Sequence, residues 1–442
     1  MTMKSILVLS LSIFLFLHNN PAQTASKTLT ETEVKIISSI DKNHSESLSL
    51  LEKVVNINSG TMNFEGVKRV GDIFAKEFVD LGCKSEWIDG KPFNRAGHLL
   101  ATCGSKQSKF NGAKLLLIGH LDTVFASNSE FQSYNKVDEQ FVSGPGIVDM
   151  KGGDVIIIEA LKALKENGVL DRLQVKVIMT GDEEKRGSPY DVATLAMVNA
   201  GKWADIALAF ENGDSNPKTA VVSRRGSTRW QLDVVGRPAH SSQIFRDKYG
   251  YGSIYEAARI LNAFRTQLST QENLTFNPGV IVGGTDVIYD PSLTKGSSFG
   301  KNNVIAQSTI VSGDIRALTP KQLIEAQADM QKIVAENLNK TSATLTFFSG
   351  YPPMSPNEGN HRLLSLYSKA SIDLGFGKVT AVDPRKAGAA DVSFVAEHVD
   401  MALDGLGLMG SGGHTIKEVA DIRTLDSQTK RAAILMYRLS KL

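Results

Sequence analysis

The sequence lacks several features that define whole classes of protein. Only 2 of its 442 residues are cysteine, too few for a fold that depends on a framework of disulfides. Lysine and arginine (49) nearly balance aspartate and glutamate (47). No basic stripe with interleaved aromatic residues occurs, which argues against nucleic-acid binding. No internal repeat or low-complexity tract is present. We therefore expect a folded chain of two domains whose partners are small molecules.

The only long apolar run lies at the N-terminus. Lys4 precedes an apolar stretch at residues 6–17, which is short for a membrane span and typical of a signal peptide. Small residues at 22–26 would contain the cleavage site, although no clean Ala-x-Ala pattern occurs and an uncleaved anchor stays the alternative. We predict that residues 1–25 are a signal peptide. The protein would then be exported, periplasmic or secreted, with no membrane contact after cleavage.

The two cysteines, Cys83 and Cys103, lie at the outer ends of two candidate strands, 84–88 and 98–102. If these strands form a hairpin, the cysteines face each other, and an exported protein meets conditions in which disulfides persist. A bridge also needs Cα atoms within about 7 Å of each other, which the sequence cannot test. A disulfide and two buried free thiols both remain open, and we prefer the free thiols.

Residues 30–210 alternate helical periodicity with short apolar runs. This is the pattern of βαβ units around a largely parallel sheet. Helical periodicity covers 65–81, 153–166 and 188–199, and the apolar runs cover 115–118, 173–179 and 206–210. We predict an α/β domain, with a mixed and largely parallel sheet, formed by residues 26–223 and 351–442.

Residues 224–350 show a different order of elements. We expect strands at 227–235, 274–282, 304–316 and 343–348, and helices at 253–268 and 320–338. The resulting order βαββαβ is that of a ferredoxin-like domain inserted into the first one. Thr319 and Gln322 predict a capping box at the start of the second helix. Residues 284–303 are expected to form a loop.

Potential metal ligands follow the three apolar runs of the first domain. His120 and Asp122 follow the first run, Glu183 and Glu184 the second, and Glu211 the third. Ligands of open α/β sheets bind beyond the carboxyl ends of the strands, so these side chains are expected to converge. The pattern predicts a metal-dependent hydrolase.

In their order along the chain, these motifs resemble the co-catalytic di-zinc exopeptidases and amidohydrolases, which include glutamate carboxypeptidase, succinyl-diaminopimelate desuccinylase, acetylornithine deacetylase and aminoacylase. The resemblance covers nearly everything after the N-terminal segment. It rests on Gly119-His120-Leu-Asp122, Gly144 to Gly153 with Asp149, Asp182-Glu183-Glu184, Phe210-Glu211, Gly236-Arg-Pro-Ala-His240, Asp314-Ile-Arg316 and Gly413-His414. It implies a zinc-binding domain interrupted by a lid domain, residues 224–350, that also forms a homodimer.

The resemblance implies five ligands for two zinc ions: His120 and Glu211 for one ion, Glu184 and His414 for the other, and Asp149 with a water or hydroxide between them. Co²⁺ or Mn²⁺ could occupy the same ligands. Asn-Gly-Asp follows Glu211 where the family often has Pro-Thr, which leaves Asp214 as a competing ligand.

The resemblance also implies how protons move. Adjacent acids at the end of an extended segment cannot both point the same way. With Glu184 on a metal, Glu183 would act as general base and then general acid, taking a proton from the attacking water and returning it to the leaving amine. Asp122 would hold His120 through the second ring nitrogen.

Three lid residues complete the predicted site. His240 resembles the family histidine that stabilises the tetrahedral oxyanion, often from the partner subunit. Asn303 and Arg316 flank one lid strand and resemble positions that contact a substrate carboxylate, for which the arginine fork is well suited. An internal salt bridge between Arg316 and Asp314 would equally explain that arginine.

We therefore predict a zinc hydrolase that cleaves the amide bond of a peptide or N-acyl amino acid. A carboxypeptidase that releases a C-terminal residue such as glutamate is the leading candidate. An aminoacylase, deacetylase or dipeptidase with the same site is the alternative within the enzyme class. A non-catalytic binding protein on the same fold is the alternative of another class, and the retention of Glu183 argues against it.

Overall fold

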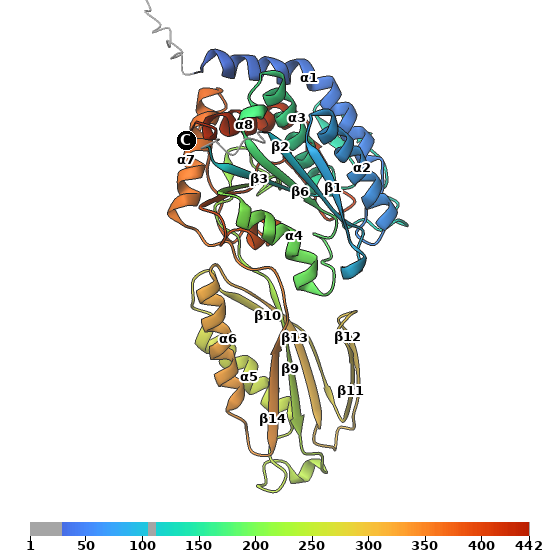
Figure 1. The fold of residues 1–442 in the computed structure, drawn as a ribbon. Coiled ribbons are helices and arrows are strands. Elements are labelled where there is room, and N and C mark those ends of the chain that lie inside the picture. The colour runs from blue at the N-terminus through green and yellow to red at the C-terminus, as the bar shows by residue number, and fades with distance from the viewer. Residues whose placement is uncertain (1–28, 105–111, 442) are drawn as a thin grey trace, which may run out of the picture.

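The computed structural model describes residues 29–104 and 112–441, so the predicted signal peptide lies outside the described residues. Figure 1 shows two lobes, an upper one that contains the beginning and the end of the described chain, and an elongated lower one. The chain crosses between them twice, and the two crossings pair with each other: Ser227 bridges to Tyr351, and Arg224 bridges to Met354. Within the described ranges, no helix has both the length and the apolar character that crossing a membrane requires.

The upper lobe is built on a six-stranded sheet. In spatial order its strands are β1 (Lys84–Asp89), β2 (Gly97–Gly104), β6 (Gln174–Thr180), β3 (Lys114–His120), β7 (Ile206–Ala209) and β16 (Met401–Leu403). The four strands β6, β3, β7 and β16 are parallel to one another, whereas β2 pairs antiparallel both with β6 and with β1 at the edge of the sheet. The predicted mixed, largely parallel sheet is therefore confirmed.

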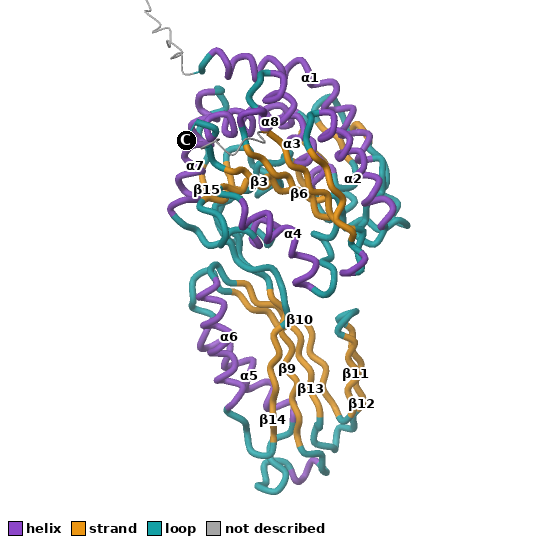
Figure 2. The backbone as a smooth tube through the Cα atoms, viewed as in Figure 1, coloured by secondary structure: helices purple, strands orange, loops and turns teal. Residues whose placement is uncertain are grey.

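Helices cover both faces of this sheet (Figure 2). One face packs against α1 (Glu31–Val55), α2 (Phe64–Asp80), α3 (Gly152–Glu166), α7 (Glu358–Asp373) and α8 (Arg423–Leu439), and the other against α4 (Tyr190–Trp203). Along β3, Leu115 and Leu117 belong to the first core, and Leu116 and Ile118 to the second. This alternation is that of a strand buried on both faces, which explains its uninterrupted apolar sequence.

Short strands bring distant loops to the carboxyl edge of the sheet. A four-stranded sheet contains β17 (Gly410–Ser411), β18 (Val419–Asp421), β5 (Phe141–Ser143) and β4 (Asn135–Lys136), and a separate pair contains β8 (Thr219–Ala220) and β15 (Thr380–Ala381). Because β18 pairs with β5, the loop between β17 and β18 lies beside the turn that leads into α3.

The lower lobe is a four-stranded antiparallel sheet backed by two helices (Figure 1). In spatial order the strands are β10 (Thr275–Gly284), β13 (Ser308–Arg316), β9 (Thr228–Gly236) and β14 (Thr341–Phe347), and the helices are α5 (Ser253–Leu268) and α6 (Pro320–Ala335). The lobe has a hydrophobic core of its own, in which Trp230 and Phe264 meet edge to face. Together with its βαββαβ chain order, this is a ferredoxin-like arrangement.

The lower lobe differs from the prediction at two places. Residues 284–303, expected as a loop, contain the hairpin of β11 (Asp286–Asp290) and β12 (Lys295–Phe299). Both strands are largely exposed, and the three-residue apolar run Val287-Ile288-Tyr289 of β11 is too short to predict a strand. Half of the expected capping box forms: the Gln322 N–H donates to Thr319 Oγ1 at 3.1 Å, but Gln322 Oε1 accepts from the Leu318 N–H instead.

Cys83 and Cys103 form a disulfide, so the preferred interpretation of two free thiols is wrong. Antiparallel pairing places Lys84 opposite Thr102, which sets the cysteines opposite each other at the next position. Their Cα atoms are 4.4 Å apart, within the range a bridge requires. The register of the hairpin decides the pairing, and the sequence left that register open.

Candidate metal centre

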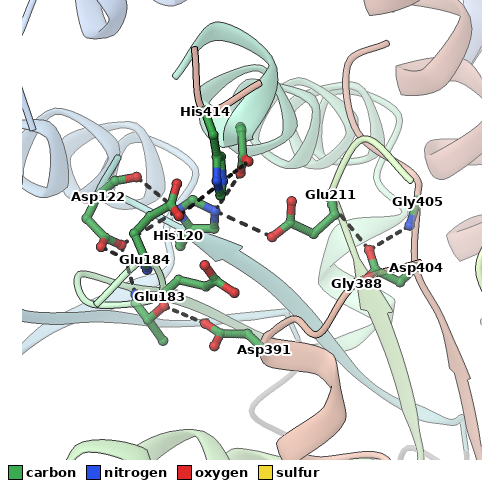
Figure 3. A network of polar contacts seen from close by, with 12 residues as sticks. His120, Asp122, Glu183, Glu184, Glu211, Gly388, Asp391, Asp404, Gly405 and His414 are labelled. Atoms are coloured by element: carbon green, nitrogen blue, oxygen red, sulfur yellow. Dashed lines mark hydrogen bonds and ion pairs between the residues drawn. The ribbon is translucent and has the colours of Figure 1, made fainter. Parts of the chain in front are cut away.

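The five predicted ligands come from separate segments that meet at the carboxyl edge of the large sheet, and Figure 3 labels all of them except Asp149. One ends β3, two follow the parallel strands β6 and β7, one lies in the turn before α3, and one lies between β17 and β18. In that order they are His120, Glu184, Glu211, Asp149 and His414. The fold thus gathers all five, as the position of ligands beyond strand ends predicts.

Asp149 lies between the two histidines. Its Oδ1 is 3.1 Å from His120 Nε2, and its Oδ2 is 2.9 Å from His414 Nε2. Each histidine also faces one further carboxylate: His120 Nε2 is 3.4 Å from Glu211 Oε1, and His414 Nε2 is 3.2 Å from Glu184 Oε2. The result is two triads of ligands that share Asp149.

The spacing within the triads suits zinc. Two donor atoms that bind one tetrahedral zinc ion at 2.0 to 2.2 Å lie about 3.4 Å from each other. The separations of 2.9 to 3.4 Å within the two triads are close to this value. Glu184 Oε1 supports the same conclusion, since it is buried and has no hydrogen-bond partner among the described residues. A cation bound at Glu184 would satisfy it.

The charges of the cluster also favour the binding of cations. Burial raises the pKa of Glu184 to about 7, even though His414 donates to it. Burial and the neighbouring Asp149 raise the pKa of Glu211. The pKa of Asp149 is lowered despite its burial, because both histidines hydrogen-bond to it. Three buried carboxylates therefore share two histidines, and a pair of divalent ions would compensate the excess negative charge.

Glu211, rather than its competitor, faces the cluster. Asp214 accepts a hydrogen bond from Thr219 Oγ1, five residues further along. The main chain at Glu211 is fixed by Asp404, whose Oδ1 accepts the Glu211 N–H at 3.2 Å. Asp404 in turn pairs with the buried Arg224, with 2.7 Å between Nε and Oδ2. This ion pair gives Arg224 a structural role in the upper lobe.

Asp122 holds the loop with the two adjacent acids. Its Oδ1 accepts the N–H of Glu183 at 3.0 Å, and its Oδ2 accepts the N–H of Glu184 at 3.2 Å and the hydroxyl of Thr61 at 2.6 Å. The nearest partner of His120 Nδ1 is the main-chain carbonyl of Asp122 at 2.9 Å, while the carboxylate lies at 3.6 Å. Asp122 thus orients the histidine mainly through its main chain.

Glu183 lies beside the ligand cluster and makes no contact with the two histidines within ion-pair distance (Figure 3). Burial raises its pKa well above the usual value, opposed by His120 and reinforced by the nearby Asp391 and Glu211. A buried carboxyl group with a raised pKa, next to a metal site, is the type of group that can accept and return a proton.

One residue that was not predicted from the sequence holds the turn with Asp149 in place. Glu418 is buried, and its carboxylate accepts the main-chain N–H groups of Gly146 at 2.9 Å, Val148 at 2.8 Å and Asp149 at 3.1 Å. Glu418 follows His414 by four residues, so its closeness in sequence to a predicted ligand could have indicated a role at the site. Burial raises the pKa of Glu418 to about 7.

The lid residues are not part of the cluster within one chain. His240 follows the end of β9 furthest from the crossing, is exposed, and bonds to Ser242, with 2.9 Å between Nδ1 and Oγ. Asn303 lies beside it, since the Ser241 N–H donates to the Asn303 carbonyl at 2.8 Å. Arg316 ends β13 at the opposite, near end, next to Thr275, and its Nε donates to Asp314 Oδ2 at 2.9 Å. The internal salt bridge therefore forms.

The fold and the cluster together define a two-lobed metal-dependent hydrolase. Residues 116–439 match the model of peptidase family M20/M25/M40, and the chain belongs to this family. Carboxypeptidase G2 of Pseudomonas sp. (strain RS-16) is 27% identical over 399 residues, which cover 89% of each chain. A probable succinyl-diaminopimelate desuccinylase of Staphylococcus aureus is 24% identical over 395 residues, which cover 82% of this chain and 90% of that protein.

Solved structures agree on the fold. An aminopeptidase of Bacillus cereus superposes with a TM-score of 0.70 at 17% identity, covering 90% of this chain and 99% of that one. A Bacillus subtilis protein described as a dinuclear metal-binding peptidase of the M20 family superposes with a TM-score of 0.63 at 14% identity, covering 91% and 99%. At these identities the likeness shows the fold alone.

Proposed function

We propose that this protein is an exported zinc hydrolase that cleaves the amide bond of a peptide or N-acyl amino acid, with a C-terminal residue as the product. The observation that carries the proposal is the position of Asp149, with one oxygen toward each of two histidines and Glu183 alongside. Such an arrangement would suit a pair of metal ions, which would supply the polarisation that amide hydrolysis requires.

We assign His120 and Glu211 to one zinc ion, Glu184 and His414 to the other, and Asp149 to both. Imidazole nitrogen and carboxylate oxygen are the ligands that zinc accepts, and Co²⁺ or Mn²⁺ can use the same set. Two divalent ions balance three carboxylates and one hydroxide, which makes a buried pair acceptable electrostatically.

Zinc ions bound here would polarise both the attacking water and the substrate carbonyl. Glu183 then accepts the proton of that water, because its carboxyl group lies beside the cluster and is not assigned to either metal ion (Figure 3). The same carboxyl group returns the proton to the leaving amine. Asp122 keeps Glu183 in place by accepting its main-chain N–H.

His240 stabilises the tetrahedral oxyanion in this proposal, and it comes from a second subunit. β9 has 9 residues and therefore spans roughly 30 Å between the crossing and its far end. His240 lies beyond that far end, so its own metal cluster is out of reach. A homodimer formed through the lid would place His240 and Asn303 of one chain over the cluster of the other, while Arg316 serves its own chain.

Two features support a substrate with a free carboxylate. Arg316 lies at the near end of β13, and its guanidinium can bind a carboxylate through two parallel hydrogen bonds once it exchanges Asp314 for substrate. Carboxypeptidase G2, among the relatives, carries the same activity in its name. The desuccinylase relatives favour the second candidate, an N-acyl amino acid hydrolase, and hydrolysis rates for matched dipeptides and N-acyl amino acids distinguish the two.

Export rests on the N-terminal sequence and on the disulfide. The apolar segment 6–17 behind Lys4 has the length of a signal-peptide core. The bridge between Cys83 and Cys103 fits an oxidising compartment. Detection of the mature protein in the periplasm or medium, with an N-terminus between residues 22 and 27, tests this part.

The test of the reaction is Glu183→Gln. The amide keeps the shape of the side chain but cannot take up a proton, so turnover is expected to fall by about 10²-fold to 10⁴-fold. Metal stoichiometry is expected to remain that of the wild type, because Glu183 is not among the ligands. The exposed Glu397→Gln is the matched control and should change neither quantity. Full hydrolysis by Glu183→Gln would refute the proposed base, and a metal-free, inactive wild type would refute the function.

A further inference from the structure

Tyr351 connects the lobe crossing to the loop with the two acids. Its main chain belongs to the returning crossing, where Tyr351 and Ser227 exchange two hydrogen bonds of 2.9 and 3.0 Å. Its side chain extends into the upper lobe, where the hydroxyl donates to the main-chain carbonyl of Glu183 at 2.5 Å. A residue of the interlobe connection thus contacts the general base of the proposed reaction directly.

The Glu183 peptide units are consequently held from two sides. Asp122 accepts the N–H of Glu183 at 3.0 Å and the N–H of Glu184 at 3.2 Å. Tyr351 donates to the carbonyl between those two N–H groups. Fixing both sides of a residue's main chain restricts where its carboxyl group can point, which is what a proton acceptor beside a reacting water requires.

Arg186 fixes the direction of the Tyr351 hydroxyl. Arg186 Nη2 donates to Tyr351 Oη at 2.9 Å, which leaves the hydroxyl proton for the Glu183 carbonyl. The guanidinium is buried, forms ion pairs with Asp182 and Asp391, and lies 5.3 Å from the centre of the Tyr351 ring. The hydroxyl is therefore held in one orientation by a rigid group.

We propose that Tyr351 is a positioning residue for the general base Glu183, acting from the connection between the lobes. This inference rests on the proposed function, because it needs Glu183 to transfer the proton. It goes beyond that function because the orientation of Glu183 then depends on the position of the segment around Tyr351, where the chain returns to the upper lobe. The structure gives Tyr351 no contact with the five metal ligands other than through the loop main chain.

The experiment compares Tyr351→Phe with Tyr190→Phe. Phenylalanine keeps the aromatic ring of Tyr351 against Phe394, at 5.0 Å between ring centres, and removes only the hydroxyl. Tyr190 is the matched control because it packs on the same Phe394 at 5.9 Å, and its buried hydroxyl has no hydrogen-bond partner in the part of the chain that the structure describes. The measurements are kcat, KM and bound zinc for the full chain with a hydrolysed dipeptide or N-acyl amino acid.

Tyr351→Phe is expected to lower kcat about tenfold, because the buried carbonyl of Glu183 loses one hydrogen bond. KM is expected to stay within about twofold of the wild type. Zinc content should not change, and Tyr190→Phe should match the wild type. A Tyr351→Phe enzyme with wild-type kcat would overturn the inference, and so would a loss of zinc or an equal deficit in Tyr190→Phe. These outcomes need an active wild type, so they differ from failure of the proposed function.

Discussion

At the scale of single residues, Glu418 shows how a side chain outside the ligand set can control the metal site. Its two oxygens accept the main-chain N–H groups of Gly146, Val148 and Asp149. Glu418→Gln would replace one oxygen by an NH₂ group that faces an N–H donor, so the turn with the bridging ligand would lose a hydrogen bond. We expect zinc affinity to fall about 10-fold to 100-fold, measured by competition with a chromophoric chelator.

The exposed acid Glu397 again offers a control, since Glu397→Gln changes the same functional group away from the site. Equal zinc affinity of Glu418→Gln and the wild type would show that the turn holds its shape without this carboxylate. Loss of secondary structure in Glu418→Gln would identify a folding defect, which circular dichroism detects.

The convergence of the predicted metal ligands could be foreseen at this scale, whereas the residues that hold them in place could not. His120, Glu184 and Glu211 each follow an apolar run, and the geometry of parallel strands makes their convergence a consequence of the pattern. Tyr351 and Glu418 act through contacts across 168 and about 270 residues of sequence. The spacing of residues in the sequence does not predict such contacts, because they depend on how the lobes and the short strands pack together.

At the scale of elements, the hairpin of β1 and β2 carries the disulfide at the edge of the large sheet. The bridge between Cys83 and Cys103, 20 residues apart, restricts the unfolded chain. We expect the double variant Cys83→Ala, Cys103→Ala to lose about 3 kcal/mol in the free energy of unfolding of the upper lobe, the amount the chain-entropy model gives for a loop of this length. Urea unfolding followed by circular dichroism measures the difference.

Reductant provides the internal control for the disulfide. Wild-type protein unfolded in the presence of dithiothreitol should behave like the double variant, and the variant itself should not respond. Identical unfolding curves for all four samples, together with free thiols in peptide mapping, would mean that the cysteines are not bridged.

Hydrophobic periodicity predicted whether a segment is a helix or a strand where one or both faces of that element are buried. The expected helix 253–268 coincides with α5, and the expected runs of β3, β6 and β7 fall within a few residues of the observed strands. The hairpin of β11 and β12 was missed because exposed strands need no apolar pattern. Its pairing is set by main-chain hydrogen bonds, which side-chain composition does not report.

At the scale of the whole molecule, the two lobes separate the groups to which the proposed reaction assigns a role. The metal cluster and Glu183 lie in the upper lobe, whereas His240 and Asn303 lie at the far end of the lower lobe. The element order of each lobe could be predicted from the sequence but this distance could not, since the direction of β9 relative to the crossing appears only in the folded chain. If His240 has its proposed role, one chain contains an incomplete site.

Subunit complementation tests whether a second chain completes it. Alone, Glu183→Gln lacks the base and His240→Ala lacks the oxyanion donor, so each homodimer is expected to be inactive. In a mixed dimer, the cluster of the His240→Ala chain keeps Glu183 and receives His240 from the Glu183→Gln chain. One of the two sites is then complete, and activity should return to about half that of wild-type dimer.

The mixed dimer can be isolated by coexpression with two different affinity tags and two successive purifications. Its hydrolysis rate is compared with those of wild type and of each variant homodimer, all at equal zinc content. A mixed dimer as inactive as its parents would mean that His240 serves its own chain or none. Because the length of β9 keeps His240 away from its own cluster, restored activity would identify the partner subunit as the source of the missing group.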